Sequence, residues 1–328
     1  MKRWNVYISR LLPKPAIDLL ADQCDVSVNP DDRVLSKEEL IDQVRGRDAV
    51  LCLLTDTIDA AVLTASPSAQ IYANYAVGFD NIDVAAATRS GILVSNTPGV
   101  LTEATADMAW ALLFAAARRV VEADRYTREG KFTGWGPLLF LGQDISGRTL
   151  GIIGAGRIGL SVARKASGFD MKVLYTDIEP NNDFEKHTGA SYADLETVLQ
   201  ESDFISIHVP LTHATKHLIG ARELSMMKET AILINTSRGP VVDEGALIEA
   251  LKERQIGGAG LDVYENEPRI EPGLIELENA VLAPHIASAT VETRTRMALM
   301  AAENILAAMR GELPPNCINP EALKHKKK

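Results

Sequence analysis

The segment Gly154-Ala155-Gly156-Arg157-Ile158-Gly159 constrains the fold of this chain more than any other feature. It follows the apolar run 149–153 and precedes the helical pattern 160–167, and a second apolar run, 172–176, ends in Asp177. This order is typical of a βαβ unit that binds a dinucleotide, with the pyrophosphate at the helix N-terminus and the acidic residue on the ribose. A glycine-rich turn without a ligand is the alternative. The predicted cofactor residues here are Gly154, Gly156, Arg157, Ile158, Gly159 and Asp177.

Length, charge and cysteine content limit the class of protein. A chain of 328 residues predicts two domains, at roughly 150 residues each. The net charge of −10 argues against a nucleic-acid partner, because phosphate contacts need a basic surface. No apolar run approaches the roughly 18 residues of a membrane span, and Pro13 and Pro15 interrupt the N-terminal segment where a signal peptide needs an apolar stretch. The cysteines Cys24, Cys52 and Cys317 have no disulfide spacing, so we expect a cytoplasmic protein.

The first hundred residues alternate apolar strands with helical segments. Short strands that alternate with helices predict a parallel sheet covered by helices on both faces. The dipeptide Pro98-Gly99 ends this first series. The expected strands are 6–9, 25–28, 49–54, 71–76 and 92–95, and the expected helices are 16–23, 37–44 and 84–90.

A second series of strands and helices begins near residue 149, after a long helical stretch from Thr102 to Arg119. Its parallel strands would suit a complete dinucleotide-binding sheet. The six expected strands are 150–153, 172–176, 204–209, 231–236, 259–263 and 281–283.

A final helix is expected at 291–311, too late in the chain to belong to the second sheet. We therefore predict that the chain returns to its first domain. The domains would be a discontinuous substrate-binding domain, 1–99 with 289–328, and a dinucleotide-binding domain, 100–288. Two crossings of the chain would form a hinge beside a cleft, where ligand sites are frequent.

Polar segments follow three strands of the second series, where an open α/β sheet borders its ligand crevice. Arg238 can bind a carboxylate through two parallel hydrogen bonds, and His285 can act as a general acid. Glu267 can orient the imidazole and favour its protonated form. Each residue also has a simpler interpretation: a surface arginine paired with Asp243 or Glu244, a polar loop, or a structural histidine.

Two other kinds of chemistry are disfavoured. His213 and His217 are four residues apart with His208 nearby, but the intervening residues supply no further ligand and Lys216 would repel a cation, so we expect no metal. Ser237 lacks the glycine elbow and the nearby histidine of a nucleophilic serine.

These residues together resemble the D-isomer-specific 2-hydroxyacid dehydrogenases, in particular their glyoxylate/hydroxypyruvate reductase branch, over nearly the whole chain. The resemblance implies an α/β protein of two Rossmann-like or flavodoxin-like domains with parallel sheets, the substrate domain being discontinuous. It implies Arg238, Glu267 and His285 as the catalytic set and a homodimer with its interface at 102–119 and the following loop. The motifs that carry it are Gly154–Gly159, His208–Thr212, Asn235–Gly239, Gly260–Tyr264, Glu267-Pro268, Pro284–Ser288 and Asn74–Asp80.

The resemblance also implies further binding residues. Backbone N–H groups of Val77 and Gly78 would bind the substrate carboxylate. Thr105 would lie near the nicotinamide ribose and Asp262 near the nicotinamide amide. Trp135 either reaches the substrate from a neighbouring subunit or only anchors the interface. The remaining implied contacts are Leu53 and Asn74 with substrate, and Val209, Pro210, Thr215, Thr236, Ser237, His285 and Ser288 with cofactor.

Two features of the sequence refine this expectation. Glu267 distinguishes the chain from the formate dehydrogenase branch, which has glutamine there. A carboxylate at Asp177 repels the 2′-phosphate of NADP, and residues 178–180 supply no arginine, so NAD is the expected cofactor. The predicted activity is NADH-dependent reduction of a small 2-oxo acid to the D-2-hydroxy acid. The substrate stays open among glyoxylate, hydroxypyruvate, pyruvate and 2-ketogluconate, and a dinucleotide-sensing corepressor is the alternative.

Overall fold

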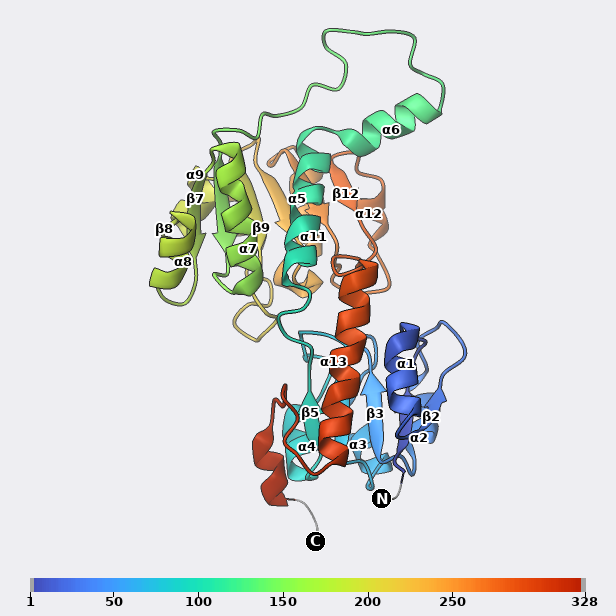
Figure 1. The fold of residues 1–328 in the computed structure, drawn as a ribbon. Helices are drawn as coiled ribbons and strands as arrows, with labels where there is room; N and C mark the ends of the chain where they lie inside the picture. Colours follow the sequence, from blue (N-terminus) through green and yellow to red (C-terminus); the bar gives the residue numbers. More distant parts are fainter. Residues whose placement is uncertain (1–2, 326–328) are drawn as a thin grey trace. The chain divides into compact units, whose positions relative to one another are not determined.

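Residues 3–325 are described by a computed structural model, in which the chain forms two units of α/β structure (Figure 1). One unit contains the chain up to Leu101 together with the chain from Ala289 onward, and the other contains Thr102–Ser288. Every strand pairing within a sheet is parallel. The prediction of an α/β fold with two parallel sheets is therefore confirmed.

The first unit contains a five-stranded sheet in the order β2-β1-β3-β4-β5. Residues that alternate along the strands pack into two separate apolar cores, one on each face of the sheet. Because both faces are covered, the strands are mostly apolar, and these runs of apolar residues made them predictable from the sequence. The strands are β1 (Asn5–Ile8), β2 (Asp25–Val28), β3 (Ala49–Cys52), β4 (Ile71–Asn74) and β5 (Leu93–Ser95).

One face of this sheet is covered by α1 (Lys14–Ala21) and by α13 (Val291–Met309), which lies far away in sequence. The other face is covered by α2 (Lys37–Val44), α3 (Ala60–Ala65) and α4 (Val84–Arg89). The sequence did not predict α3, which has only six residues and begins at the capping side chain of Asp59. The last element among the described residues is a 3-10 helix, η3 (Pro320–His325).

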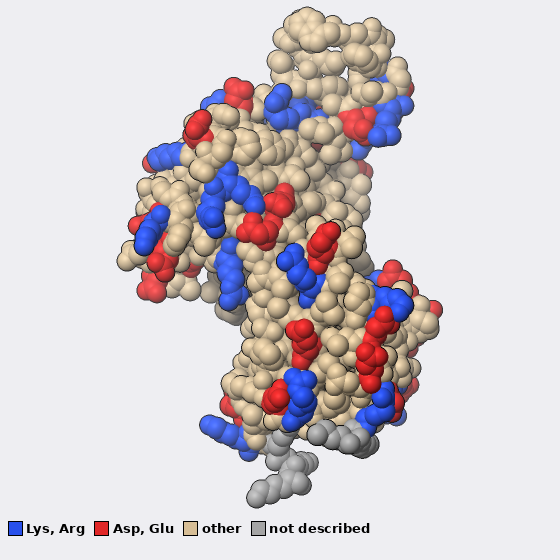
Figure 2. Space-filling view, viewed as in Figure 1, with Lys and Arg blue, Asp and Glu red and all other residues tan. Residues whose placement is uncertain are grey.

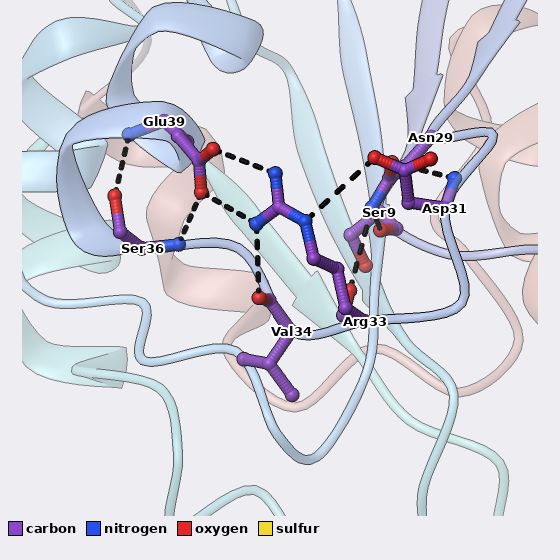
Figure 3. Close-up of polar contacts among 7 residues, drawn as sticks. All are labelled: Ser9, Asn29, Asp31, Arg33, Val34, Ser36 and Glu39. Carbon is purple, nitrogen blue, oxygen red and sulfur yellow. Dashed lines mark hydrogen bonds and ion pairs between the residues drawn. The ribbon is translucent and has the colours of Figure 1, made fainter.

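The loop from β2 to α2 is held by side-chain hydrogen bonds (Figure 3). Arg33 donates two hydrogen bonds to Glu39, at 2.8 and 2.7 Å. Glu39 also forms a capping box with Ser36, which fixes the start of α2 at the predicted residue. Asn29 donates to the carbonyl of Ser9, so the loop is tied to the carboxyl end of β1.

The second unit contains a seven-stranded sheet in the order β12-β11-β10-β9-β6-β7-β8. The six predicted strands are present, and the added strand, β8, has only two residues, which is too short for a periodic signal. Strand order reverses between β6 and β9, which defines the switch point of a doubly wound sheet. The strands are β6 (Thr149–Ile153), β7 (Lys172–Thr176), β8 (Ser191–Tyr192), β9 (Phe204–Ile207), β10 (Ile232–Asn235), β11 (Gly258–Leu261) and β12 (Ala280–Leu282).

Apolar cores cover both faces of this sheet as well. The helical stretch predicted for 102–119 is present as α5 (Thr102–Ala117). Arg119, whose backbone is left-handed with φ 55°, separates this helix from a second one, α6 (Val120–Arg128), that the sequence did not predict. In Figure 1, α6 and the loop after it extend away from this sheet. The helices are α5 (Thr102–Ala117), α6 (Val120–Arg128), α7 (Arg157–Ala166), η1 (Ser167–Phe169), α8 (Asn182–Thr188), α9 (Leu195–Glu201), α10 (Ala221–Met226), η2 (Gly239–Val241), α11 (Glu244–Lys252) and α12 (Pro272–Ile275).

A helix that crosses a membrane must be both long and apolar. Within residues 3–325, no helix combines the length and the apolar character that a membrane crossing requires.

Candidate active site

The predicted site segments of the second unit follow the carboxyl ends of β6, β7, β9, β10, β11 and β12. Parallel pairing brings these ends to one edge of the sheet. This edge includes the switch point between β6 and β9, where α/β sheets bind ligands.

The glycine-rich turn after β6 depends on close approach of the backbone. Gly154 has φ 103°, and a Cβ there would lie 2.8 Å from the carbonyl carbon of His208. A Cβ on Gly159 would lie 2.1 Å from the oxygen of Gly154, so α7 packs directly on the turn. A Cβ on Gly156 would meet no atom within 4 Å, and no side chain caps α7. The turn therefore presents open space at a helix N-terminus, which suits a pyrophosphate.

Asp177 follows β7 and is held against this turn. Its Oδ2 accepts a hydrogen bond from the N–H of Ala155 at 2.7 Å, and its Oδ1 accepts one from the N–H of Ile178 at 2.7 Å. The Ile178 side chain is 99% exposed. A fixed carboxylate beside an exposed apolar side chain matches what the ribose and adenine of a dinucleotide require.

Other residues expected at the cofactor line the same edge. Thr215 follows β9 and donates its hydroxyl to the carbonyl of Pro210 at 2.6 Å, which shapes the loop that begins with Val209. Thr236 follows β10, and its buried hydroxyl has no hydrogen-bond partner among residues 3–325. A buried polar atom without a partner suits a ligand that would supply one. Thr105 is buried in α5.

Arg238 is presented by a tight turn after β10. The buried side chain of Asn235 accepts from the N–H of Ser237 at 3.0 Å and donates to the carbonyl of Arg238 at 2.9 Å. Gly239 lies so close to the loop after β11 that a Cβ there would be 1.8 Å from the oxygen of Tyr264. Only glycine permits this approach, which brings the Arg238 turn beside the loop that carries Glu267.

Glu267 and His285 form the pair that the sequence predicted. His285 Nδ1 lies 2.8 Å from Glu267 Oε2, and Glu267 Oε1 accepts the N–H of Tyr264 at 2.9 Å. Burial alone raises the pKa of the Glu267 carboxyl. The hydrogen bond from His285 and the charges of His285 and Arg238 overcome burial and hold this pKa below its usual value. Because a carboxylate only accepts hydrogen bonds, Nδ1 carries the proton, and Nε2 is left for chemistry.

Asp262 holds the segment that carries His285. Its Oδ1 accepts from the N–H of Ile286 at 2.8 Å and its Oδ2 from the N–H of Ala287 at 2.7 Å. Asp262 is fully buried, and burial raises the pKa of its carboxyl although both hydrogen bonds lower it. These bonds support the left-handed backbone of His285, whose φ is 54°. The sequence marked Asp262 for the nicotinamide, and nothing in the residue pattern indicated this bracing contact.

A second acidic cluster supports the loop of Glu267, and the sequence analysis did not find it. The buried Glu244 accepts the N–H groups of Glu265 at 2.9 Å and Glu271 at 3.2 Å. Glu265 in turn lies 2.7 Å from His217 Nε2. His217 thus pairs with a carboxylate. His208 lies 2.8 Å from the hydroxyl of Ser206, and burial lowers the pKa of its imidazole to about 3.

The first unit carries the expected substrate residues at the carboxyl edge of its own sheet. Leu53 follows β3, Asn74 ends β4, and Val77 and Gly78 lie in the loop after β4. Trp135 lies in the loop after α6 with 86% of its surface exposed.

A cavity of about 280 Å³ lies at the opposite edge of the second sheet. It is lined by the first residues of β10 and β11 and by Leu141 and the ion-paired residues Arg119 and Glu122. This position separates it from the glycine-rich turn and from the Glu267–His285 pair.

One doubly wound sheet carries the glycine-rich turn, the His285–Glu267 pair and the adjacent Arg238. Together these features define a nicotinamide-dependent dehydrogenase. Residues 110–287 match the model of the D-isomer specific 2-hydroxyacid dehydrogenase, NAD binding domain. The chain therefore belongs to the D-isomer-specific 2-hydroxyacid dehydrogenases, and the predicted membership is confirmed. It is an NAD(P)-dependent dehydrogenase, and the corepressor alternative is not favoured.

Similar proteins extend over the whole chain. A glyoxylate reductase of Korarchaeum cryptofilum is 56% identical, covering 98% of this chain and 97% of that relative. A solved protein of Thermus thermophilus has a TM-score of 0.91 at 44% identity, covering 96% of this chain and 99% of that one. An NADPH-dependent glyoxylate/hydroxypyruvate reductase of Sinorhizobium meliloti, solved with NADP and malonate, has a TM-score of 0.87 at 30% identity and covers 100% of both chains.

Proposed function

We propose that this enzyme reduces glyoxylate, and hydroxypyruvate as a related substrate, to the D-2-hydroxy acid with a reduced nicotinamide dinucleotide. The observation that carries the proposal is the 2.8 Å contact of His285 with Glu267 on the sheet edge that also bears the glycine-rich turn. The names of the similar reductases support the choice of substrate.

The reaction needs an anchor for the substrate and a proton for the forming alkoxide. A bound reduced nicotinamide supplies the hydride. Arg238 binds the substrate through its guanidinium fork, which fits a carboxylate or a carbonyl oxygen. His285 donates the proton from Nε2 to the carbonyl oxygen, while Glu267 orients the ring through Nδ1 and stabilises its charge.

The second unit is proposed as the dinucleotide-binding domain. Its glycine-rich turn would hold the pyrophosphate, and Thr236 with its unpartnered hydroxyl would contact the nicotinamide half. NAD is the proposed cofactor, because the carboxylate of Asp177 repels a 2′-phosphate. A kcat/KM for NADPH above that for NADH would refute this preference.

The first unit is proposed as the substrate-binding domain. Backbone N–H groups of Val77 and Gly78 would bind the substrate carboxylate, and Leu53 would contact the rest of the substrate. Smaller and larger 2-oxo acids then differ in how they fill the space beside these residues. A panel of glyoxylate, hydroxypyruvate, pyruvate and 2-ketogluconate assayed with NADH ranks the substrates.

We also propose a homodimer whose interface includes the loop after α6. Residues 132–143 contain no charged side chain, and Figure 2 shows this projecting part of the molecule without charge. Its apolar side chains are exposed, Trp135 at 86% and Leu138 at 79%. Contiguous exposed apolar surface of this kind marks interfaces. Light scattering should give twice the chain mass, and a monomer would refute the proposal.

Trp135 has two possible roles in that dimer. If it reaches the partner's substrate, Trp135→Ala changes the ranking of 2-oxo acids; if it is only an anchor, KM values stay the same and dimerisation weakens. Cytoplasmic location is also proposed, because Cys24, Cys52 and Cys317 are all free thiols.

The decisive assay for the proposed activity follows NADH absorbance after addition of glyoxylate. Turnover of at least about 1 per second, in the usual range for enzymes, supports it. Tight NADH binding without turnover on any 2-oxo acid would contradict it.

A further inference from the structure

Three successive peptide carbonyls in the loop after β4 are held by hydrogen bonds from the interior of the first unit. Two of the donors are asparagine side chains, and the third is a backbone N–H in the segment after β5. The bonds run from Thr97 N to Ala76 O at 2.8 Å, from Asn96 Nδ2 to Val77 O at 2.7 Å and from Asn74 Nδ2 to Gly78 O at 2.9 Å.

Fixing these carbonyls also fixes the N–H groups on the other side of the same peptides. In a trans peptide the N–H points opposite to the C=O, and these three peptides are trans. The N–H groups of Val77, Gly78 and Phe79 therefore point away from the donors. In the part of the chain that the structure describes, none of the three donates a hydrogen bond. Successive N–H groups on one side of a loop form an anion-binding nest.

Each asparagine is itself anchored. Asn74 is fully buried and also donates to the side chain of Asn81, which donates to the carbonyls of Leu53 and Asp56 at 3.0 Å. These bonds tie the loop after β4 to the loop after β3. The side-chain amide nitrogen of Asn74 thus donates both of its hydrogen bonds within the first unit, one of them to the backbone of the loop.

Asn96 is anchored by the returning C-terminal segment. The fully buried Asn304 of α13 donates to the carbonyl of Asn96 at 3.3 Å, and the N–H of Asn96 donates to the carbonyl of Asn316 at 3.3 Å. The position of the Val77 carbonyl therefore depends on residues more than two hundred positions later in the chain.

We propose that Asn96 and Asn74 are positioning residues that orient the N–H groups of Val77, Gly78 and Phe79 toward the substrate carboxylate. The inference rests on the proposed reduction of a 2-oxo acid, and it adds Phe79 N–H as a third donor. Fixed backbone N–H groups bind the substrate carboxylate, which is the anionic group that all 2-oxo acids have in common. The side chain of the substrate is left to other residues.

The test compares Asn96→Ala and the isosteric Asn96→Asp with the control Asn279→Ala. Asn279 is also half-buried and donates its amide to a backbone carbonyl, that of Leu251 at 3.2 Å, at the opposite edge of the second sheet. Both Asn96 variants should raise the KM for glyoxylate about tenfold, as expected when hydrogen bonds to a carboxylate weaken. Their kcat should stay within about threefold of the parent, and their NADH dissociation constant should not change.

Asn96→Asp should be the more severe variant, because its carboxylate faces the Val77 carbonyl without a donor. A general structural defect would instead lower kcat, NADH affinity and melting temperature together, and that pattern would overturn the proposal. A KM equal to that of Asn279→Ala would overturn it as well.

A second readout does not depend on turnover. Amide hydrogen exchange in peptides covering 76–80 should be fast in the parent enzyme with NADH and should slow on addition of oxalate, a carboxylate analogue of the substrate. The slowing should be lost in both Asn96 variants. If oxalate slows exchange at 76–80 but the enzyme reduces no 2-oxo acid, the proposed reaction is refuted and the positioning of these amides is not. Normal turnover with no protection of 76–80 refutes the positioning of these amides alone.

Discussion

Replacing Gly239 with alanine tests how the site is assembled, because this one glycine lets the Arg238 turn pack against the loop of Glu267. The added Cβ would lie 1.8 Å from the oxygen and 1.9 Å from the carbonyl carbon of Tyr264. Real Cβ atoms keep at least 3.0 Å from such neighbours, so the two loops must separate by roughly 1.2 Å. Both partners are backbone, and no flexible side chain can move aside.

Two effects follow from a displacement of this size. Overpacking of this kind lowers the free energy of unfolding by about 1–3 kcal/mol. A misplacement of about 1 Å between groups that act together lowers the rate about 100-fold. The variant Gly239→Ala should therefore fold, melt at a lower temperature and lose about 99% of its kcat/KM for glyoxylate.

The matched control is Gly168→Ala. A Cβ at this exposed position meets no atom within 4 Å, and its backbone is not left-handed. This variant should keep full activity, with stability unchanged or slightly raised. The assays are urea unfolding and steady-state kinetics for both variants. If Gly239→Ala matches Gly168→Ala in kcat/KM, then the close approach of the two loops does not position the catalytic groups.

Three further substitutions address individual contacts. Arg238→Lys should lower kcat/KM at least about 100-fold, because an ammonium cannot reproduce the fork; activity near that of the parent would reject Arg238 as the anchor. Glu267→Gln should lower kcat, because the imidazole of His285 loses the carboxylate that binds its Nδ1–H and fixes the orientation of the ring; an unchanged kcat would contradict this role. The pKa of Glu267 in the folded protein lies below its ordinary value of 4.5, so the ionised carboxylate stabilises the fold above that pH. This stabilisation is lost as the pH falls through the folded pKa. Denaturant titrations should therefore show that the difference in unfolding free energy between the parent and Glu267→Gln narrows below about pH 4.5. Asp262→Asn leaves one backbone N–H unpaired and should lower the free energy of unfolding by about 2 kcal/mol together with kcat; an unchanged kcat would contradict its bracing of His285.

The chemistry-bearing segments were predictable because local sequence encodes them. Apolar runs give the strands, and parallel strands place the residues that follow them at one edge of the sheet. That logic was sufficient to bring Glu267 and His285 together, and the structure places them 2.8 Å apart. The final helix was also assigned away from the second sheet, and α13 packs on the first one.

The supporting contacts were not predictable in the same way. The carbonyl of Val77 is bound by Asn96, nineteen residues later, and the N–H of Ala287 by Asp262, twenty-five residues earlier. Such hydrogen bonds produce no repeating pattern in the sequence, and the residues that form them cannot be distinguished there from other polar residues in loops. The close approach of Gly239 to Tyr264 was not predictable either, because the sequence does not show which loop glycines are required by a backbone contact and which are not. Short elements such as α3 and β8 contain too few residues to repeat a pattern.

The most direct test of the account is the turnover of His285→Asn at saturating NADH and glyoxylate. Asparagine tolerates the left-handed backbone at this position, where φ is 54°, so the substitution removes the proton donor with little strain. The account predicts that kcat falls between about 100-fold and 10,000-fold, with melting temperature and NADH affinity preserved. A kcat within about tenfold of the parent enzyme would show that His285 is not the proton donor.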